Sequence, residues 1–68
     1  MNIIKSYPIT DIDGTELPSV DLLRVAGVYF IDNLNTGAEV MVEDLATAKD
    51  VAQAMCNRNQ RNYNKANV

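Results

Sequence analysis

The sequence predicts a small α+β protein in which one helix packs across an antiparallel sheet. Two patterns support this prediction. Residues 28–31 are β-branched or aromatic and residues 38–43 alternate with period two, which predicts two strands joined by a tight turn. Residues 45–60 repeat apolar side chains at helical spacing. With 68 residues, 47% of them apolar and 22% charged, the chain has the composition of one folded domain. We therefore expect a single domain over residues 1–68, with a polar tail that frays from about residue 60.

The N-terminal segment carries a weaker pattern. Residues 3–7 are predicted to form a strand, and Pro8 marks an edge or an end of it because proline has no backbone N–H to donate. The dipeptide Asp13-Gly14 predicts a turn.

A short helix is predicted over residues 19–26, before the hairpin. Ser19 is a good N-cap and Gly27 is a good residue to close such a helix. The alternative is an extended run over residues 22–31 with a bulge at Gly27.

Residues 28–43 are predicted to form a β-hairpin, closed by a three-residue loop at 35–37 that ends in Gly37. That loop length would place Leu34 opposite Ala38 and so fix which side chains share a face. One face is assigned to the core and contains Val28, Phe30, Leu34, Ala38, Val40 and Val42. The other face would contain Tyr29, Ile31, Glu39, Met41 and Glu43.

The C-terminal helix is predicted to start after Asp44, which can accept a hydrogen bond from the first turn, with Leu45 as its first residue. Its core-facing stripe consists of Leu45, Ala48, Val51, Ala52, Met55, Cys56 and Asn59.

The composition argues against catalysis. The chain has no His and only one Cys, so Ser–His and Cys–His nucleophile pairs are excluded, together with nearly every zinc site. A chain this short has little room for an enclosed pocket. We expect no catalytic residues, no cofactor and no metal site.

The segment Asp11-Ile12-Asp13-Gly14-Thr15 resembles the first motif of the haloacid dehalogenase-like phosphatases. The resemblance would make Asp11 the nucleophile and Asp13 the general acid. Because the chain is too short for that family's framework, we interpret the segment as a solvated turn, and an enzyme remains the last of the hypotheses.

The second hairpin face is the predicted protein-binding site. Tyr29, Ile31 and Met41 form an apolar patch bordered by Glu39 and Glu43. Three alternatives would cover this patch: the short helix of this chain, a second copy of the chain, or a different protein. Residues 1–56 carry three basic and nine acidic side chains, a net charge of −6, which favours a basic partner.

The C-terminal segment has the opposite charge. Residues 57–68 carry three basic side chains and no acid. A nucleic-acid contact would use Arg58, Arg61, Tyr63 and Lys65.

These observations predict a non-catalytic binding protein that occupies a surface of a larger macromolecule. The expected partner is a host protein with a basic, nucleic-acid-handling face. By analogy of size and charge, the chain resembles small phage-encoded inhibitors or modulators. The alternatives are a nucleic-acid-binding module and a self-associating accessory protein, such as a homodimer. With no signal peptide or membrane span in the sequence, we expect a cytoplasmic protein with no membrane partner.

Overall fold

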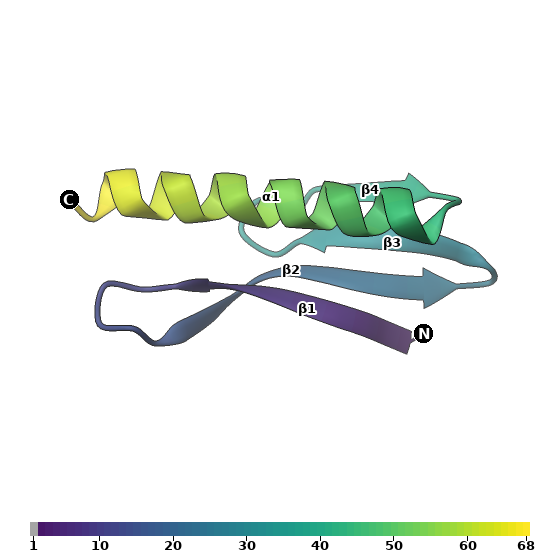
Figure 1. Ribbon diagram of the computed structural model, residues 1–68, viewed down its shortest axis with the longest axis horizontal. Coiled ribbons are helices and arrows are strands. Elements are labelled where there is room, and N and C mark those ends of the chain that lie inside the picture. Colours follow the sequence, from purple (N-terminus) through teal and green to yellow (C-terminus); the bar gives the residue numbers. More distant parts are fainter. Residues whose placement is uncertain (1) are drawn as a thin grey trace.

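A four-stranded antiparallel sheet with one helix across it forms the protein (Figure 1), as described by a computed structural model over residues 2–68. The strands follow one another in the order β1-β2-β3-β4, and α1 packs across one face of this sheet in contact with all four strands. The elements are β1 (Asn2–Thr10), β2 (Glu16–Val25), β3 (Val28–Asn33), β4 (Glu39–Val42) and α1 (Leu45–Ala66). The predicted α+β class, the hairpin and the C-terminal helix are confirmed.

The short helix predicted over residues 19–26 is absent, and this prediction was wrong. The segment belongs to β2, in which Val20 and Leu22 are fully buried two residues apart. A two-residue turn then leads into β3, with Ala26 at φ 51° and Gly27 at φ 82°. Hairpin turns of this kind need positive φ at both positions and usually use Asn-Gly. The Ala-Gly sequence gives only a weak turn signal, so Gly27 resembled a helix end.

Strand β1 is longer than predicted and forms one edge of the sheet, with Pro8 inside it. The turn after β1 is organised by Asp11, whose carboxylate accepts hydrogen bonds from the backbone N–H groups of Asp13 (2.9 Å) and Thr15 (3.1 Å). The side-chain hydrogen bond with Asp11 holds the pKa of Asp13 below its usual value.

The loop of the β3–β4 hairpin is one residue longer than the predicted three-residue loop. Asn33 pairs with Ala38: its N–H donates to the Ala38 carbonyl (2.8 Å), and its carbonyl accepts from the Gly37 N–H (2.8 Å). The loop therefore has four residues, Leu34–Gly37. Ile31 lies opposite Val40, and Phe30 lies opposite Met41. Because side chains alternate between faces, this shift moves every β3 side chain to the face opposite the predicted one.

The core between sheet and helix reflects this register. Ile31 is fully buried and Tyr29 packs against the core, so both face α1. Val40 and Val42 pack there as predicted. The predicted core positions in β3 and its loop were wrong, since Phe30 pairs with exposed Met41 and Leu34 is itself exposed. The buried core cluster consists of Tyr7, Ile9, Val20, Leu22, Ile31, Ala48, Ala52 and Cys56.

Helix α1 begins as predicted and ends later. Asp44 caps it by accepting hydrogen bonds from the N–H (2.8 Å) and hydroxyl (2.9 Å) of Thr47, and these bonds lower the pKa of Asp44. The predicted stripe faces the sheet. The helix continues to Ala66 because Gln60 makes two hydrogen bonds to the Thr10 backbone (2.7 and 2.9 Å) and Tyr63 packs on the core.

A buried polar cluster joins the helix to two strands. The Asn59 amide donates to the Ser19 hydroxyl (2.8 Å) and to the Asn33 side-chain oxygen (3.1 Å). Ser19 faces the helix because β2 contains a β-bulge. Tyr7 pairs with Val20 but Ile9 pairs with Leu17, so β2 has one more residue than β1 between these pairs, and the extra residue turns inward. No buried side-chain nitrogen or oxygen in residues 2–68 lacks a hydrogen-bond partner.

Asn59→Ala tests this cluster. The change leaves the Ser19 hydroxyl and the Asn33 amide without their helix partner, so the free energy of unfolding should fall by about 2 kcal/mol in urea denaturation. The control is Asn62→Ala on the exposed side of α1, which should change it by less than about 0.5 kcal/mol. Equal effects of the two substitutions would show that the cluster contributes nothing specific.

Candidate functional site

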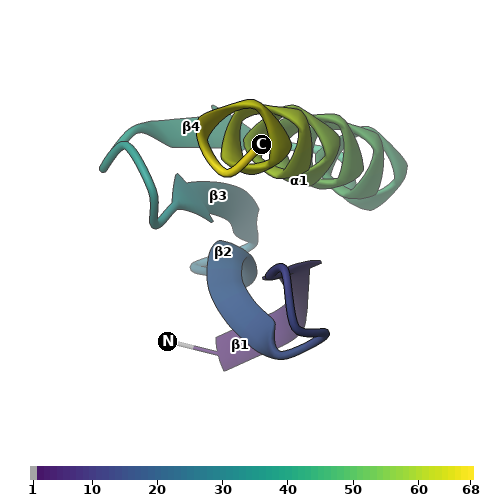
Figure 2. The same ribbon diagram turned by 90° about the vertical axis from the view of Figure 1, so that its left-hand side faces the viewer.

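On the face of the sheet opposite α1, which we call the outer face, residues 2–68 form no further layer of secondary structure (Figure 2). One line of directly opposed residues crosses all four strands on this face. We call it the apolar row. Ile3 and Met41, at its two ends, are 58% and 59% exposed, whereas Leu23 in its middle is covered by its neighbours. The row consists of Ile3, Leu23, Phe30 and Met41.

A second line of opposed residues runs beside the first and is acidic. Asp21 lies opposite Asp32, and Asp32 lies opposite Glu39; these three residues are the acidic row. Ser6 extends the line onto β1, where its hydroxyl donates to the Asp21 carboxylate (2.9 Å). No lysine or arginine among the described residues occupies either row. The outer face therefore combines exposed apolar surface with concentrated negative charge.

Asp32 and Glu39 lie directly opposite each other on β3 and β4. The pair next to them, Asn33 and Ala38, is hydrogen-bonded through its backbone, so Asp32 and Glu39 form a non-hydrogen-bonded pair, in which opposed side chains come closest. A side-chain hydrogen bond with Asp32, with some desolvation and the Asp32 charge, raises the pKa of Glu39.

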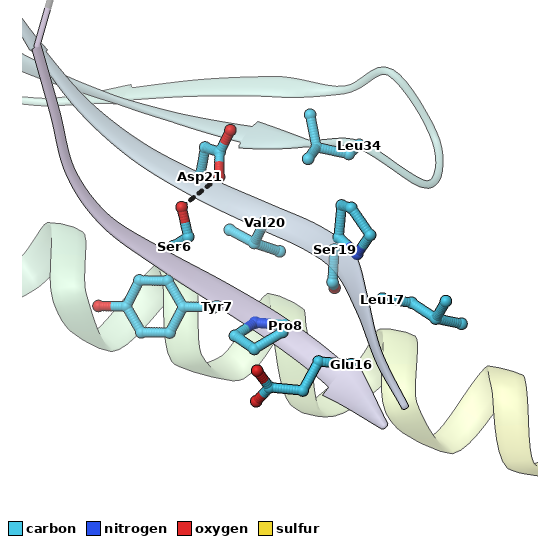
Figure 3. A pocket seen from close by; sticks show the side chains of 10 residues that line it. Ser6, Tyr7, Pro8, Glu16, Leu17, Ser19, Val20, Asp21 and Leu34 are labelled. Atoms are coloured by element: carbon cyan, nitrogen blue, oxygen red, sulfur yellow. Dashed lines mark hydrogen bonds between the residues drawn. The ribbon is translucent and has the colours of Figure 1, made fainter. Parts of the chain in front are cut away.

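Three open hollows lie along the acidic row. The first, of about 550 Å³, follows β1 and β2 where Ser6 and Asp21 are joined (Figure 3). The second, of about 370 Å³, lies between the β3–β4 loop and the Asp32–Glu39 pair. The third, of about 210 Å³, is lined by Leu23, Val25, Phe30, Asp32 and Glu39. Each hollow has at least one carboxylate and one apolar side chain in its lining, which suits long basic side chains with apolar stems.

The structure separates the five residues predicted to bind protein. Glu39 and Met41 lie in the two rows of the outer face, and Glu43 is exposed just after β4. Tyr29 and Ile31 face the helix, so the predicted common face was wrong for them. The reason is the fourth loop residue in the β3–β4 hairpin.

Sequence reasoning missed several outer-face residues. Asp21 and Leu23 were hidden by the helix prediction, and Phe30 was assigned to the core. The polarity of Asn33, which ends β3, was a usable signal, because Asn33 pairs with Asn59 of the helix stripe.

The basic residues predicted for nucleic acid form a separate group. Arg58, Arg61 and Lys65 are exposed on α1, and the two arginines line an open groove of about 580 Å³ beside the β3–β4 loop. Tyr63 packs against the core and does not belong to this basic stripe.

Asp11, which the phosphatase resemblance would make a nucleophile, lies in the turn after β1. The carboxylate of Asp11 accepts hydrogen bonds from the backbone of the turn that it organises. Within residues 2–68, no group of three or more acidic or Cys side chains is arranged to hold a metal ion. Nor does any helix in this range combine the length and the apolar character needed to cross a bilayer.

Comparison with known proteins gives no further guide to the site. No protein-family model matches the chain, and neither the curated proteins nor the solved structures give a significant match.

Glu39→Gln tests the carboxyl pair through the pH dependence of stability. The raised pKa of Glu39 means that the folded protein binds this proton more tightly than the unfolded chain, so stability falls as pH rises from the ordinary value of 4.5 to the higher folded value. Removing the carboxyl group should therefore increase the free energy of unfolding at neutral pH. The gain should vanish below about pH 4, where Glu39 is protonated in both states.

Chemical denaturation at a series of pH values measures this difference. Glu43→Gln is the control, because it removes an equal charge from an exposed position outside the acidic row. A gain for Glu39→Gln that stays constant down to low pH, or that Glu43→Gln matches, would contradict a direct interaction between Asp32 and Glu39.

Proposed function

We propose that this chain is a non-catalytic binding protein that docks its outer face onto a basic surface of a larger protein. The observation that supports this proposal is the position of the acidic row beside the apolar row on an uncovered sheet face. Apolar contact supplies affinity, and complementary charge supplies orientation and a fast encounter.

Like charges placed directly opposite each other across strands destabilise a sheet. The chain nevertheless holds three carboxylates in one line, at Asp21, Asp32 and Glu39. A partner that places lysine or arginine between them removes this repulsion and adds attraction. The acidic row thus gains more from a basic partner than three isolated surface acids would.

A second copy of the chain is a poorer occupant of this face. Packing two outer faces together would bring two acidic rows into one interface, without a cation from either copy in the rows. Burying unpaired carboxylates is costly. We therefore favour a different protein over a homodimer.

The partner class that we favour is a host protein that handles nucleic acid. A surface built to bind phosphates presents several lysine and arginine side chains close together, which is what the acidic row requires. The small size and negative charge of the chain suit a phage-type inhibitor or modulator that covers such a surface in the cytoplasm.

A nucleic-acid-binding module is the second candidate function. The observation in its favour is the exposed basic group of Arg58, Arg61 and Lys65, two members of which line a groove. Three phosphate contacts support only weak, salt-sensitive binding. The ring of Tyr63 is engaged with the core, which removes the stacking platform expected there.

Placing a positive charge on the outer face should weaken partner binding. In capture of host proteins by the immobilised chain, Asp32→Lys and Met41→Arg should each weaken the retained complex by at least about tenfold. Asp50→Lys makes the same charge change on an exposed position of α1 and should retain the partner. If all three variants bind equally, the docking face lies elsewhere.

A gel-shift titration tests the alternative. If the chain does not bind nucleic acid, neither duplex nor single-stranded DNA should shift at low salt. A shift that Arg58→Ala/Arg61→Ala eliminates, and that Asp32→Lys does not, would replace the proposed function with the nucleic-acid module.

A further inference from the structure

The outward edge of β4 has unpaired backbone groups. Asn33 and Ala38 form a hydrogen-bonded pair, so the alternation of antiparallel strands turns the N–H and C=O groups of Glu39 and Met41 away from β3. No turn, loop, cap or side-chain hydrogen bond of residues 2–68 engages these groups, and β3 is the strand that pairs with β4 in this part of the chain. Since β4 is the last strand of the sheet, they face the space in which a fifth strand would lie.

The opposite edge of the sheet is partly closed. On β1, the side-chain amide of Gln60 bonds both the N–H and the C=O of Thr10, as a neighbouring strand would. The Cys56 thiol donates to the carbonyls of Tyr7 (3.5 Å) and Pro8 (3.3 Å), and Pro8 has no N–H to offer. The helix thus covers the C-terminal half of the β1 edge, a common way to prevent strand pairing, whereas the described residues leave β4 open.

We propose that the edge of β4 pairs with an extended segment of the basic partner, which adds a fifth strand to the sheet. This inference rests on the proposed function and specifies how the partner docks. An added strand extends both rows of the outer face by one residue. It places one side chain beside Glu39 at the end of the acidic row and another beside Met41 at the end of the apolar row. The matching partner sequence is a basic residue and an apolar residue separated by one position.

The negative charge of the acidic row favours a basic segment of the partner over a second copy of the chain at the β4 edge. Pairing of two β4 edges would bring two acidic rows together on one continuous face, six carboxylates with no cation in the rows of either copy. A lysine or arginine beside Glu39 instead lies next to the site where two carboxyl groups are directly opposed across β3 and β4. The exposed Met41 side chain adapts its shape to an apolar neighbour.

Amide hydrogen exchange with a defined probe tests the proposal. The probe is the blocked peptide Thr-Lys-Thr-Val-Thr-Lys-Thr-Val at millimolar concentration, which presents Lys and Val on one face when extended. Its control is Lys-Lys-Thr-Thr-Val-Val-Thr-Thr, which has the same composition and charge. With the first peptide, exchange of the Glu39 and Met41 amides should slow by at least about tenfold, because both amides become hydrogen-bonded. The second peptide should protect neither amide.

Backbone N-methylation distinguishes strand addition at the β4 edge from docking through the side chains of the outer face alone. A chemically synthesised chain with N-methyl Met41 keeps every side chain but lacks one edge donor, and it should lose binding of the alternating peptide by more than tenfold. N-methyl Ala46, at an exposed position in the first turn of α1, is the control and should bind normally.

The outcomes are distinct. Peptide or partner binding that perturbs Asp32 and Phe30 but leaves the Glu39 and Met41 amides fast would overturn strand addition and keep the proposed function. Failure of the alternating peptide to bind would overturn the strand addition, while loss of partner capture in Asp32→Lys would still support the docking face. Protection that rises with chain concentration without peptide would show that a second copy occupies the edge, which also overturns the proposal.

Discussion

The orientation of Asn33 determines which residues of this protein face solvent. Its side chain points toward α1, where Asn59 bonds it, and its backbone pairs with Ala38 to close a four-residue loop. Both constraints place Ile31 inside and Phe30 and Asp32 outside. The two rows of the outer face follow from this one register, because a slip of one residue would bury Asp32 under the helix and expose Ile31. An unpaired carboxylate in that position would cost more than the sheet could recover.

The buried polar cluster of Asn59, Ser19 and Asn33 fixes the register of the sheet better than apolar contacts do. Apolar side chains pack in several arrangements of similar energy, whereas the Asn59 amide must meet the Ser19 hydroxyl and the Asn33 oxygen together. It links the β2 bulge, the end of β3 and the third turn from the end of α1. In a chain of 68 residues with a small core, such a cluster contributes specificity of register that burial alone does not supply.

The sequence predicted those parts of the fold that depend on local patterns. The cap at Asp44, the helix stripe and the existence of the hairpin all follow from residues close together in the chain. The register of the hairpin could not be predicted in the same way, because Asn33 is fixed by Asn59, 26 positions away. The outer face was predicted only in part for this reason: Glu39 and Met41 were assigned to the face opposite the C-terminal helix, but their true neighbours on β3 and β2 were not. The turn at Ala26 was missed because positive φ at alanine leaves no sequence signal.

The missing helix and the open face have the same cause. A helix over residues 19–26 could have covered the outer face, and it was the cover within the chain that the sequence suggested. Those residues instead form the centre of the sheet, where Val20 and Leu22 complete the core and Asp21 and Leu23 become part of the outer face. The described chain has no second helix to place over Phe30 and Met41. The proposed partner would supply cover for the apolar row, and a basic surface on it would complement the adjacent acidic row.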